Sequence, residues 1–293
     1  MNTSRETIGL SLGFLGMCLF AGTLPATRLA VPSFDPWLLT AARAALAGLA
    51  GLIVLLVTRR RLPPRSAWIE MICAAVCTVI GFPLFAALAM VTVPAAHGGV
   101  VLGIVPIATA VAATIIARER PSFGFWVASV VGAIIVLAFV LRKNGGEAFA
   151  AGDLFLLGMV AAGALGYTLS GRLTGLMPGW EVISWQVLIF FPFAAIATFM
   201  LWPENLVHVT FVSWAGLAYV SLVSQFTAFF VFNAGLAMGG IARVGQVMLL
   251  QPFIVVALAT LVNREPINIE TILFAIAVVT TVLIGQRMRV ARS

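Results

Sequence analysis

The side chains of this sequence that could bind or react with a solute are few, and most of them lie within long apolar runs. Arg43 is the basic residue that lies deepest in such a run, roughly 10 Å from its start at ~1.5 Å per residue. Polar groups are costly inside a bilayer, so they are the first candidates for function. A guanidinium there could hold a carboxylate through two parallel hydrogen bonds. Alternatively, it reaches back to the interface or binds backbone carbonyls between helices.

Two further polar side chains stand where apolar runs begin. His97 opens the run 95–117, and Arg243 lies at the start of the run 241–263. Either residue could bind the anionic end of a solute or act as a gate. Alternatively, both are interfacial residues at helix starts.

Amide and aromatic side chains inside the runs could complete a pocket. An apolar, aromatic lining with a few polar anchors is the usual make-up of a small-molecule site. An amide could instead tie two helices together, and most phenylalanines of membrane helices face lipid or pack on neighbours. The candidates for the cavity, besides Arg43 and His97, are Phe82, Tyr167, Trp185, Gln186, Gln225, Asn233, Gln246 and Gln251.

Pro106 and Pro252 stand at matching places in the runs that contain His97 and Arg243. A proline inside a helix removes one backbone hydrogen bond and bends the helix. Each bend could be a pivot on which one half of the molecule rocks against the other, or it could be static. These two prolines and Arg243 are therefore the candidates for hinge and gate.

The composition indicates that this chain is embedded in a lipid bilayer. Of its 293 residues 62% are hydrophobic and only 9% are charged, with a mean hydropathy of +1.12, which is too little polar surface for a soluble domain of this size. A spanning helix needs ~20 mostly apolar residues. Ten such runs are present, at 8–29, 36–57, 67–91, 95–117, 122–141, 152–175, 181–202, 211–237, 241–263 and 268–286.

The positive charges indicate orientation and not a nucleic-acid partner. The net charge is +7, but the arginines lie in short loops and not along one exposed face. Of the 17 Lys and Arg residues, twelve lie on the side of the N-terminus, four on the other side, and Arg43 within a run. Because cytoplasmic loops carry the excess of positive charge, both termini are expected in the cytoplasm.

The chain contains the same segment twice, with a constant offset of 146 positions. Each copy is a long apolar run with a proline within it, closed by Arg-Glu and followed by another apolar run. The pairs are Ala96 and Ala242, Pro106 and Pro252, Ala113 and Ala259, Arg118 and Arg264, and Glu119 and Glu265. A unit of five spans is odd, so a second copy must enter the membrane the other way up. The sequence therefore predicts an all-α polytopic membrane protein of ten transmembrane helices, as two inverted five-helix repeats over 1–143 and 144–293.

These features resemble a known superfamily. Ten spans in a 5+5 inverted repeat, with Pro106 and Arg118-Glu119-Arg120-Pro121 in one copy and Pro252 and Arg264-Glu265-Pro266 in the other, are similar to the drug/metabolite transporter superfamily, with the EamA-type exporters as the closest branch. Within it, the YddG-type aromatic amino-acid exporters are the most similar in overall character.

The resemblance implies efflux of a small metabolite through a central cavity. The third, fourth, eighth and ninth spans would line the cavity, and the first, second, sixth and seventh would contribute. We therefore expect a multi-pass exporter of the bacterial inner membrane that works by alternating access and carries amino acids, aromatic or otherwise neutral or zwitterionic. One chain should contain the full pathway, with a small-molecule substrate and the lipid bilayer as its partners.

The positions of the acids limit the mechanism. None of the ten acidic residues lies in the middle of a run, and Glu119, Asp153, Glu181 and Glu265 are all near ends. A pump that exchanges organic cations for protons usually needs a buried carboxylate, so facilitated diffusion or coupling through a group such as His97 is expected instead.

The alternative functions are an intramembrane enzyme, a lipid-carrier flippase and a non-transporting membrane scaffold. The two histidines lie at a helix start and in a loop, and no cluster of His, Asp or Glu is present. No catalytic residue, metal or cofactor is therefore expected.

Overall fold

The computed structural model describes residues 3–117, 120–121, 123–143, 151–203, 208–239, 247–266, 268–287 and 290–291. This part of the chain is helical, apart from loops and two short strands. The strands β1 (Arg120–Pro121) and β2 (Val290–Ala291) pair in antiparallel fashion, and so bring the loop before residue 123 against the end of the chain.

The helical segments of the first half follow the predicted apolar runs. They are α1 (Thr3–Ala21), α2 (Thr23–Ala30), α3 (Pro36–Val57), η1 (Arg65–Ala67), α4 (Trp68–Ala75), η2 (Val76–Gly81), α5 (Phe82–Thr92), α6 (Ala95–Leu102), α7 (Val105–Ala117) and α8 (Phe123–Lys143). Those of the second half are α9 (Ala151–Leu173), α10 (Gly179–Met200), α11 (Phe211–Ala218), η3 (Tyr219–Thr227), α12 (Ala228–Gly239), η4 (Met248–Leu250), α14 (Gln251–Asn263) and α15 (Ile269–Arg287).

Within the described residues, six continuous helices are long and apolar enough to cross a membrane. They cover Thr7–Ala30, Pro36–Val57, Arg65–Thr92, Ala151–Leu173, Gly179–Met200 and Phe211–Gly235. A seventh candidate is the pair Ala95–Leu102 and Val105–Ile116, which is bent by 41° at its break. Trp126–Arg142, Met248–Asn263 and Ile269–Thr281 form shorter apolar helices. The chain is therefore a multi-pass helical membrane protein.

Local sequence explains where several helices begin. The side chain of Asp35 accepts a hydrogen bond from the backbone N–H of Trp37, and Pro36 occupies the first turn of α3, where its missing N–H costs nothing. Thr210 caps α11 in the same way, through the N–H of Ser213. Capping residues are thus present at both of these loop-to-helix transitions.

Both repeated prolines stand at the start of a helical segment and not in the middle of one. Pro106 is the second residue of α7, directly after the break that follows α6, and Pro252 is the second residue of α14, after the 3-10 turn η4. In a first turn a proline removes no hydrogen bond of its own helix. The prolines therefore mark matching interruptions of two helical runs.

Two further irregularities match between the halves. η2 and η3 are π-helical turns, in which the backbone hydrogen bonds span five residues, and they lie within the third and eighth predicted runs. Such turns are rare and are frequent at functional sites.

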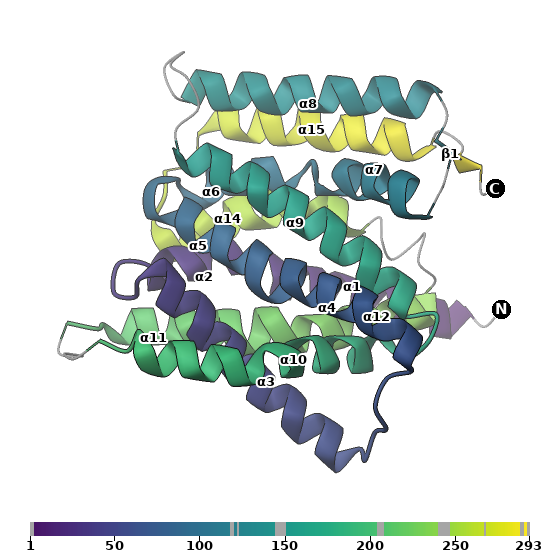
Figure 1. The fold of residues 1–293 in the computed structure, drawn as a ribbon. Helices are drawn as coiled ribbons and strands as arrows, with labels where there is room; N and C mark the ends of the chain where they lie inside the picture. The colour runs from purple at the N-terminus through teal and green to yellow at the C-terminus, as the bar shows by residue number, and fades with distance from the viewer. Residues whose placement is uncertain are drawn as a thin grey trace.

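The helices pack in pairs that are the same when the two halves are exchanged. α3 lies along α10, α8 along α15, and α6 along α14. The contact of α9 with α4 and α5 has its counterpart in the contact of α1 and α2 with α12 and α11. Figure 1 shows α8 and α15 side by side along one edge of the bundle, with α3, α10 and α11 on the opposite side.

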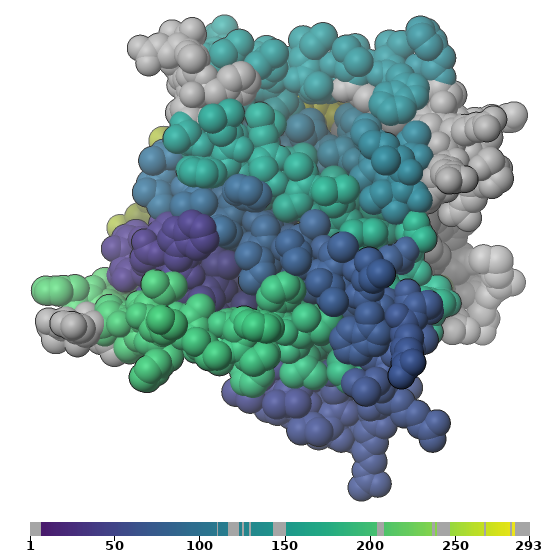
Figure 2. Space-filling view, viewed as in Figure 1, coloured from purple at the N-terminus to yellow at the C-terminus, as the bar shows by residue number. Residues whose placement is uncertain are grey.

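The surface of the bundle is apolar. Phe199 and Phe211 are 84% and 85% exposed, and many further leucines, isoleucines and valines lie open on the outside, as expected where the surrounding solvent is hydrocarbon. The C-terminal end of α3 stands out from the body of the molecule (Figure 2). In Figure 1, α1 begins and α15 ends at the same end of the bundle.

Candidate solute-binding site

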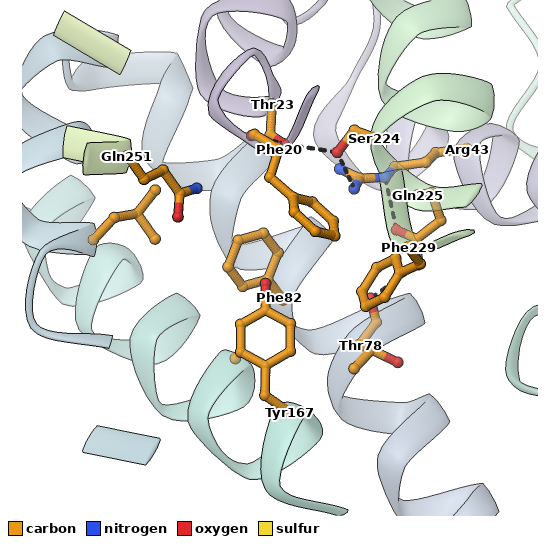
Figure 3. Close-up of a pocket in the computed structure, with 12 residues that line it drawn as sticks. Phe20, Thr23, Arg43, Thr78, Phe82, Tyr167, Ser224, Gln225, Phe229 and Gln251 are labelled. Atoms are coloured by element: carbon orange, nitrogen blue, oxygen red, sulfur yellow. Dashed lines mark hydrogen bonds between the residues drawn. The ribbon is translucent and has the colours of Figure 1, made fainter. Parts of the chain in front are cut away.

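A pocket lies inside the bundle, between helices of both halves. It is narrow in this structure, with space for about one water molecule between its side chains. The lining residues are Phe20, Thr23, Arg43, Thr78, Phe82, Leu102, Gly163, Tyr167, Ser224, Gln225, Phe229 and Gln251. Figure 3 shows most of these side chains directed toward one another from several helices.

Arg43 supplies the positive charge of the pocket. Its side chain is only 5% exposed. Its Nε–H donates to Oε1 of Gln225 at 3.0 Å, and an Nη2–H donates to Oγ of Ser224 at 3.3 Å. Both partners are neutral and both belong to the π-turn η3, so the structure holds a buried guanidinium through neutral groups.

Pro83 explains why Gln225 is held in this orientation. In η2 the N–H of Phe82 closes a π-turn on the carbonyl of Cys77. The next bond of that pattern would run from residue 83 to the carbonyl of Thr78, but proline has no N–H. The Thr78 carbonyl accepts the Nε2–H of Gln225 instead, at 3.2 Å, which turns Oε1 of Gln225 toward Arg43.

The hydroxyl groups on the other side of Arg43 have a defined direction. Thr23 donates its single O–H to the carbonyl of Phe20 at 2.5 Å, so Ser224 must be the donor in their 2.6 Å contact. The oxygen of Ser224 is then left to accept from Arg43. The guanidinium is therefore fixed from α2 and η3 together.

The polar chain continues away from the pocket. Oε1 of Gln186 lies 3.2 Å from the Thr78 hydroxyl, and its Nε2–H donates to Ser170 at 2.8 Å. Gln186 thus connects α10, η2 and α9 without lining the pocket.

Aromatic rings form the rest of the wall. Phe20 and Phe229 meet edge to face with their centroids 4.8 Å apart, and Tyr167 lies 6.4 Å from Phe229. Figure 3 shows Phe20, Phe82 and Tyr167 between Gln251 on one side and Arg43 on the other. The pocket therefore has one charged polar end, an aromatic middle and one neutral amide.

The lining comes from equivalent places in the two halves. Gln225 and Phe229 follow Thr78 and Phe82 by the same 147 positions (225 − 78 and 229 − 82), one more than the offset of 146 between the repeated segments. A second hollow shares Leu102 and Gln251 with the pocket, and both Pro106 and Pro252 line it. The matching interruptions of the two halves therefore surround the same interior space.

Polar contacts join the two halves where α6 and α9 begin, and we call this region the α6/α9 end. Nε2 of His97 lies 3.0 Å from Oδ1 of Asp153, with exposures of 7% and 2%. The carboxylate of Glu265 accepts from the N–H groups of Ala95 and Ala96, at 2.8 and 2.9 Å, and so caps α6.

Two further contacts stabilise the α6/α9 end. Arg28 donates to the carbonyls of Met90 and Val91 at the end of α5, and Asn263 donates to the carbonyl of Pro25 at 3.1 Å. The pocket is therefore separated from this end by tightly packed, hydrogen-bonded helix termini.

The structure brings five of the predicted cavity residues together: Arg43, Phe82, Tyr167, Gln225 and Gln251. Among the others, His97 lies at the α6/α9 end, and Gln186 in the polar chain. Trp185 packs in an apolar cluster around Leu55 and Met71, and Asn233 lies against Gly179 at the start of α10. Gln246 and Arg243 are outside the described residues.

Sequence reasoning did not select several lining residues, namely Phe20, Thr23, Thr78, Leu102, Gly163, Ser224 and Phe229. A signal existed for Thr78 and Phe229, because the repeat aligns them with Gln225 and Phe82. Thr23, Gly163 and Ser224 carried no such signal, since small residues are common throughout membrane helices.

This fold and pocket define a class: a membrane-embedded helical bundle that encloses a narrow, partly polar pocket between two similar halves. The sequence pattern of the EamA-like transporter family matches the chain twice, over residues 7–141 and 150–285. The "Uncharacterized transporter YdeK" of Bacillus subtilis (strain 168) is 38% identical over 284 residues, covering 97% of this chain and 99% of that protein. One solved crystal structure shares the fold, with a TM-score of 0.65 and 19% identity over 97% of this chain and 99% of the other.

The chain belongs to the EamA-like transporter family. It is a multi-pass membrane transporter and not an enzyme. The resemblance to the EamA-type proteins, inferred from the ten apolar runs and the repeated proline and Arg-Glu positions, is thereby confirmed.

Proposed function

We propose that this protein exports small organic solutes across the bacterial inner membrane by alternating access, with the pocket around Arg43 as its binding site. The observation that carries the proposal is the position of that pocket, which is enclosed by repeat-related segments of both halves. Sites at the interface of two repeats are typical of transporters in which one half rocks against the other.

We propose that the chain crosses the membrane ten times. The six long apolar helices, the bent pair α6 and α7, and the three shorter apolar helices each overlap one of the ten predicted runs. The exchange symmetry of the helix contacts supports two five-helix units, 1–143 and 144–293. An odd number of spans in each unit makes the two units inverted relative to each other.

The contacts between loops support the proposed arrangement of the two membrane faces. Arg172 pairs with Glu70 at 2.6 Å and Arg60 lies 3.7 Å from Glu181, so the loops after α3 and α9 share one end. The strand pair β1–β2 and the two termini lie at that end as well. It also carries most of the Arg residues, which favours a cytoplasmic location for both termini.

The opposite end, where α6 and α9 begin, then faces outward. Export from the pocket requires α6 to separate there from α9 and from Glu265, while Gly99 and Gly103 keep α6 in close contact with α14 and α15. Pro106 and Pro252 are placed at the interruptions that such a movement would use as hinges, and Arg243 is the proposed gate at the cytoplasmic end.

The pocket suits solutes that combine a carboxylate with an apolar or aromatic part, amino acids included. Arg43 can bind the carboxylate, and Phe20, Phe82 and Phe229 can contact the apolar part. No described residue of the lining is acidic, so organic cations would find no counter-charge.

Counterflow into proteoliposomes tests this function. Vesicles loaded with one unlabelled solute from a panel of amino acids, organic acids, amines and nucleotides should take up the same labelled solute faster than protein-free vesicles. Acceleration for at least one carboxylate-bearing solute is expected. A panel without any protein-dependent uptake would refute the exporter.

Cysteine labelling tests the topology separately. In a background without Cys18, Cys73 and Cys77, a cysteine at Ser66 and one at Ser33 should react with an impermeant maleimide from opposite sides of the membrane. Labelling of both from the same side would contradict ten inverted spans.

A further inference from the structure

We infer that the preferred solutes of this pocket are organic monocarboxylates without an ammonium group, bound through Arg43. This inference rests on the proposed function and narrows it. Amino acids would be carried less well than the corresponding acids that lack the amino group.

The first argument is the charge of the pocket. Arg43 is always protonated in a protein, and its partners Gln225 and Ser224 are neutral. In the described part of the chain, the acidic residues with described side chains all make contacts away from Arg43. Asp35 caps α3, Glu70 pairs with Arg172, Asp153 with His97, Glu181 with Arg60, Glu265 caps α6, and Glu270 pairs with Arg142.

The sequence between α12 and residue 247 adds no acidic residue either. Residues 240–246 contain Arg243 and no acid. Among the described side chains, none therefore compensates the charge of Arg43, and a bound carboxylate would neutralise it.

The second argument is the hydrogen-bonding capacity of the guanidinium. Arginine has five N–H groups. The hydrogen bonds to Gln225 and Ser224 use Nε–H and one Nη2–H, and both acceptors belong to the π-turn η3. Arg43 itself lines the pocket, so the remaining N–H groups are available to a ligand there.

The third argument concerns the amino group of a zwitterion. The groups that could meet an ammonium are the hydroxyls of Thr23, Thr78 and Tyr167, the amide of Gln251 and the faces of the phenylalanines. These groups can partly solvate a cation but carry no opposite charge. A zwitterion would thus bring a second positive charge into a space where Arg43 is already positive. The same carbon skeleton without the amino group avoids this cost.

The fourth argument is the driving force. A membrane potential of 100 mV, negative inside, shifts the concentration ratio of a monoanion outward by about 50-fold. A carrier of monoanions would therefore export them without a coupled proton. This agrees with a pocket in which no described lining residue is an acid.

Binding of a matched ligand series tests the inference. The purified full chain in detergent is titrated with 3-phenylpropionate, L-phenylalanine and L-phenylalaninamide, and binding is followed by calorimetry. The first two differ only in the amino group, and the last lacks the free carboxylate. We expect 3-phenylpropionate to bind at least about tenfold more tightly than L-phenylalanine, and L-phenylalaninamide not to bind.

Two substitutions connect this preference to Arg43. Arg43→Gln removes the charge, and Gln225→Glu places a permanent counter-charge 3.0 Å from it. Both should abolish binding of 3-phenylpropionate. Arg61→Gln, in the exposed loop after α3, is the matched control and should bind like the wild type. Because Arg43→Gln could impair folding, a normal gel-filtration profile is required, and the ligand series on the wild type needs no variant at all.

An electrical measurement tests the charge that is moved. On a solid-supported membrane with reconstituted protein, a jump in 3-phenylpropionate should carry negative charge into the vesicles. Passive leakage of the neutral acid carries no charge, so protein-free vesicles and Arg43→Gln should give no current.

The outcomes separate the two levels of proposal. Three results would each overturn the inference: equal or tighter binding of L-phenylalanine, binding of 3-phenylpropionate that survives both Arg43→Gln and Gln225→Glu, or no binding of 3-phenylpropionate. In each of these cases, counterflow of other solutes would still support the exporter. Monocarboxylate binding without counterflow of any solute would support the inference and refute the exporter.

Discussion

Replacing His97 by phenylalanine would leave the carboxylate of Asp153 buried without its imidazole partner. The two groups are 3.0 Å apart, and both are more than nine-tenths buried between α6 and α9. Phenylalanine keeps a ring against Phe139, whose centroid lies 4.8 Å from that of His97. The substitution therefore changes the charge and the hydrogen bonding of the pair more than the packing.

The cost follows from the group that each variant leaves behind. His97→Phe removes the imidazole from a buried carboxylate, and breaking a buried ion pair in this way costs ~3–5 kcal/mol. Asp153→Asn leaves a neutral amide that can still hydrogen-bond to the imidazole, so it should destabilise the protein less. At ~2–4 °C for each kcal/mol, the unfolding midpoint of His97→Phe should fall by about 6–20 °C.

Thermal unfolding in detergent, followed by the fluorescence of the seven tryptophans, measures this difference. The double variant His97→Phe/Asp153→Asn should be more stable than His97→Phe alone, because the second substitution removes the carboxylate. His97→Gln, which can still donate to Asp153, should lie between the wild type and His97→Phe. Equal losses in the two single variants, or a double variant below both, would refute the reasoning.

Three further predictions concern the helix ends and close contacts. Glu265→Gln leaves one acceptor for the N–H groups of Ala95 and Ala96 and should cost about 1–2 kcal/mol in the same assay; an unchanged midpoint would contradict the capping role. Gly216→Ala places a methyl group 2.6 Å from the carbonyl oxygen of Ala26 and should lower the free energy of unfolding by about 1–3 kcal/mol. Gly171→Ala, whose new methyl group would have nothing within 4 Å, should leave the stability unchanged or raise it. If the two alanines behave alike, close approach of α2 and α11 is not the cause. Pro106→Ala and Pro252→Ala remove prolines from first helical turns and should change the free energy of unfolding by less than about 1 kcal/mol. If the interruptions act as hinges, both variants should nevertheless slow counterflow. Wild-type flux in both would exclude that role.

The sequence predicted the membrane helices well because the length of an apolar run is a local property. The predicted run 36–57 is α3 without a shift, and the run 152–175 differs from α9 by only one or two residues at each end. The prediction of a membrane transporter of the EamA type is confirmed. Its basis, the repeated proline and Arg-Glu positions, can likewise be read directly from the sequence.

The partners of polar side chains could not be predicted in the same way. In a soluble helix the apolar face marks the core, but in lipid the outside is as apolar as the inside. Nothing local therefore indicates that Arg43 faces Ser224 and Gln225, or that His97 meets Asp153. The prediction that acids lie near helix ends holds for Asp153, but its burial depends on how α6 and α9 cross.

The amino-acid sequence by itself determined that this protein lies in a membrane, which segments become helices, and that its two halves are repeats of each other. All three follow from run length, hydropathy and repetition. Only the tertiary structure decided that two π-turns face one pocket and that Pro83, by lacking an N–H, frees the Thr78 carbonyl to orient Gln225 toward Arg43. That outcome depends on the rotation of each helix against its neighbours, which packing sets and composition does not.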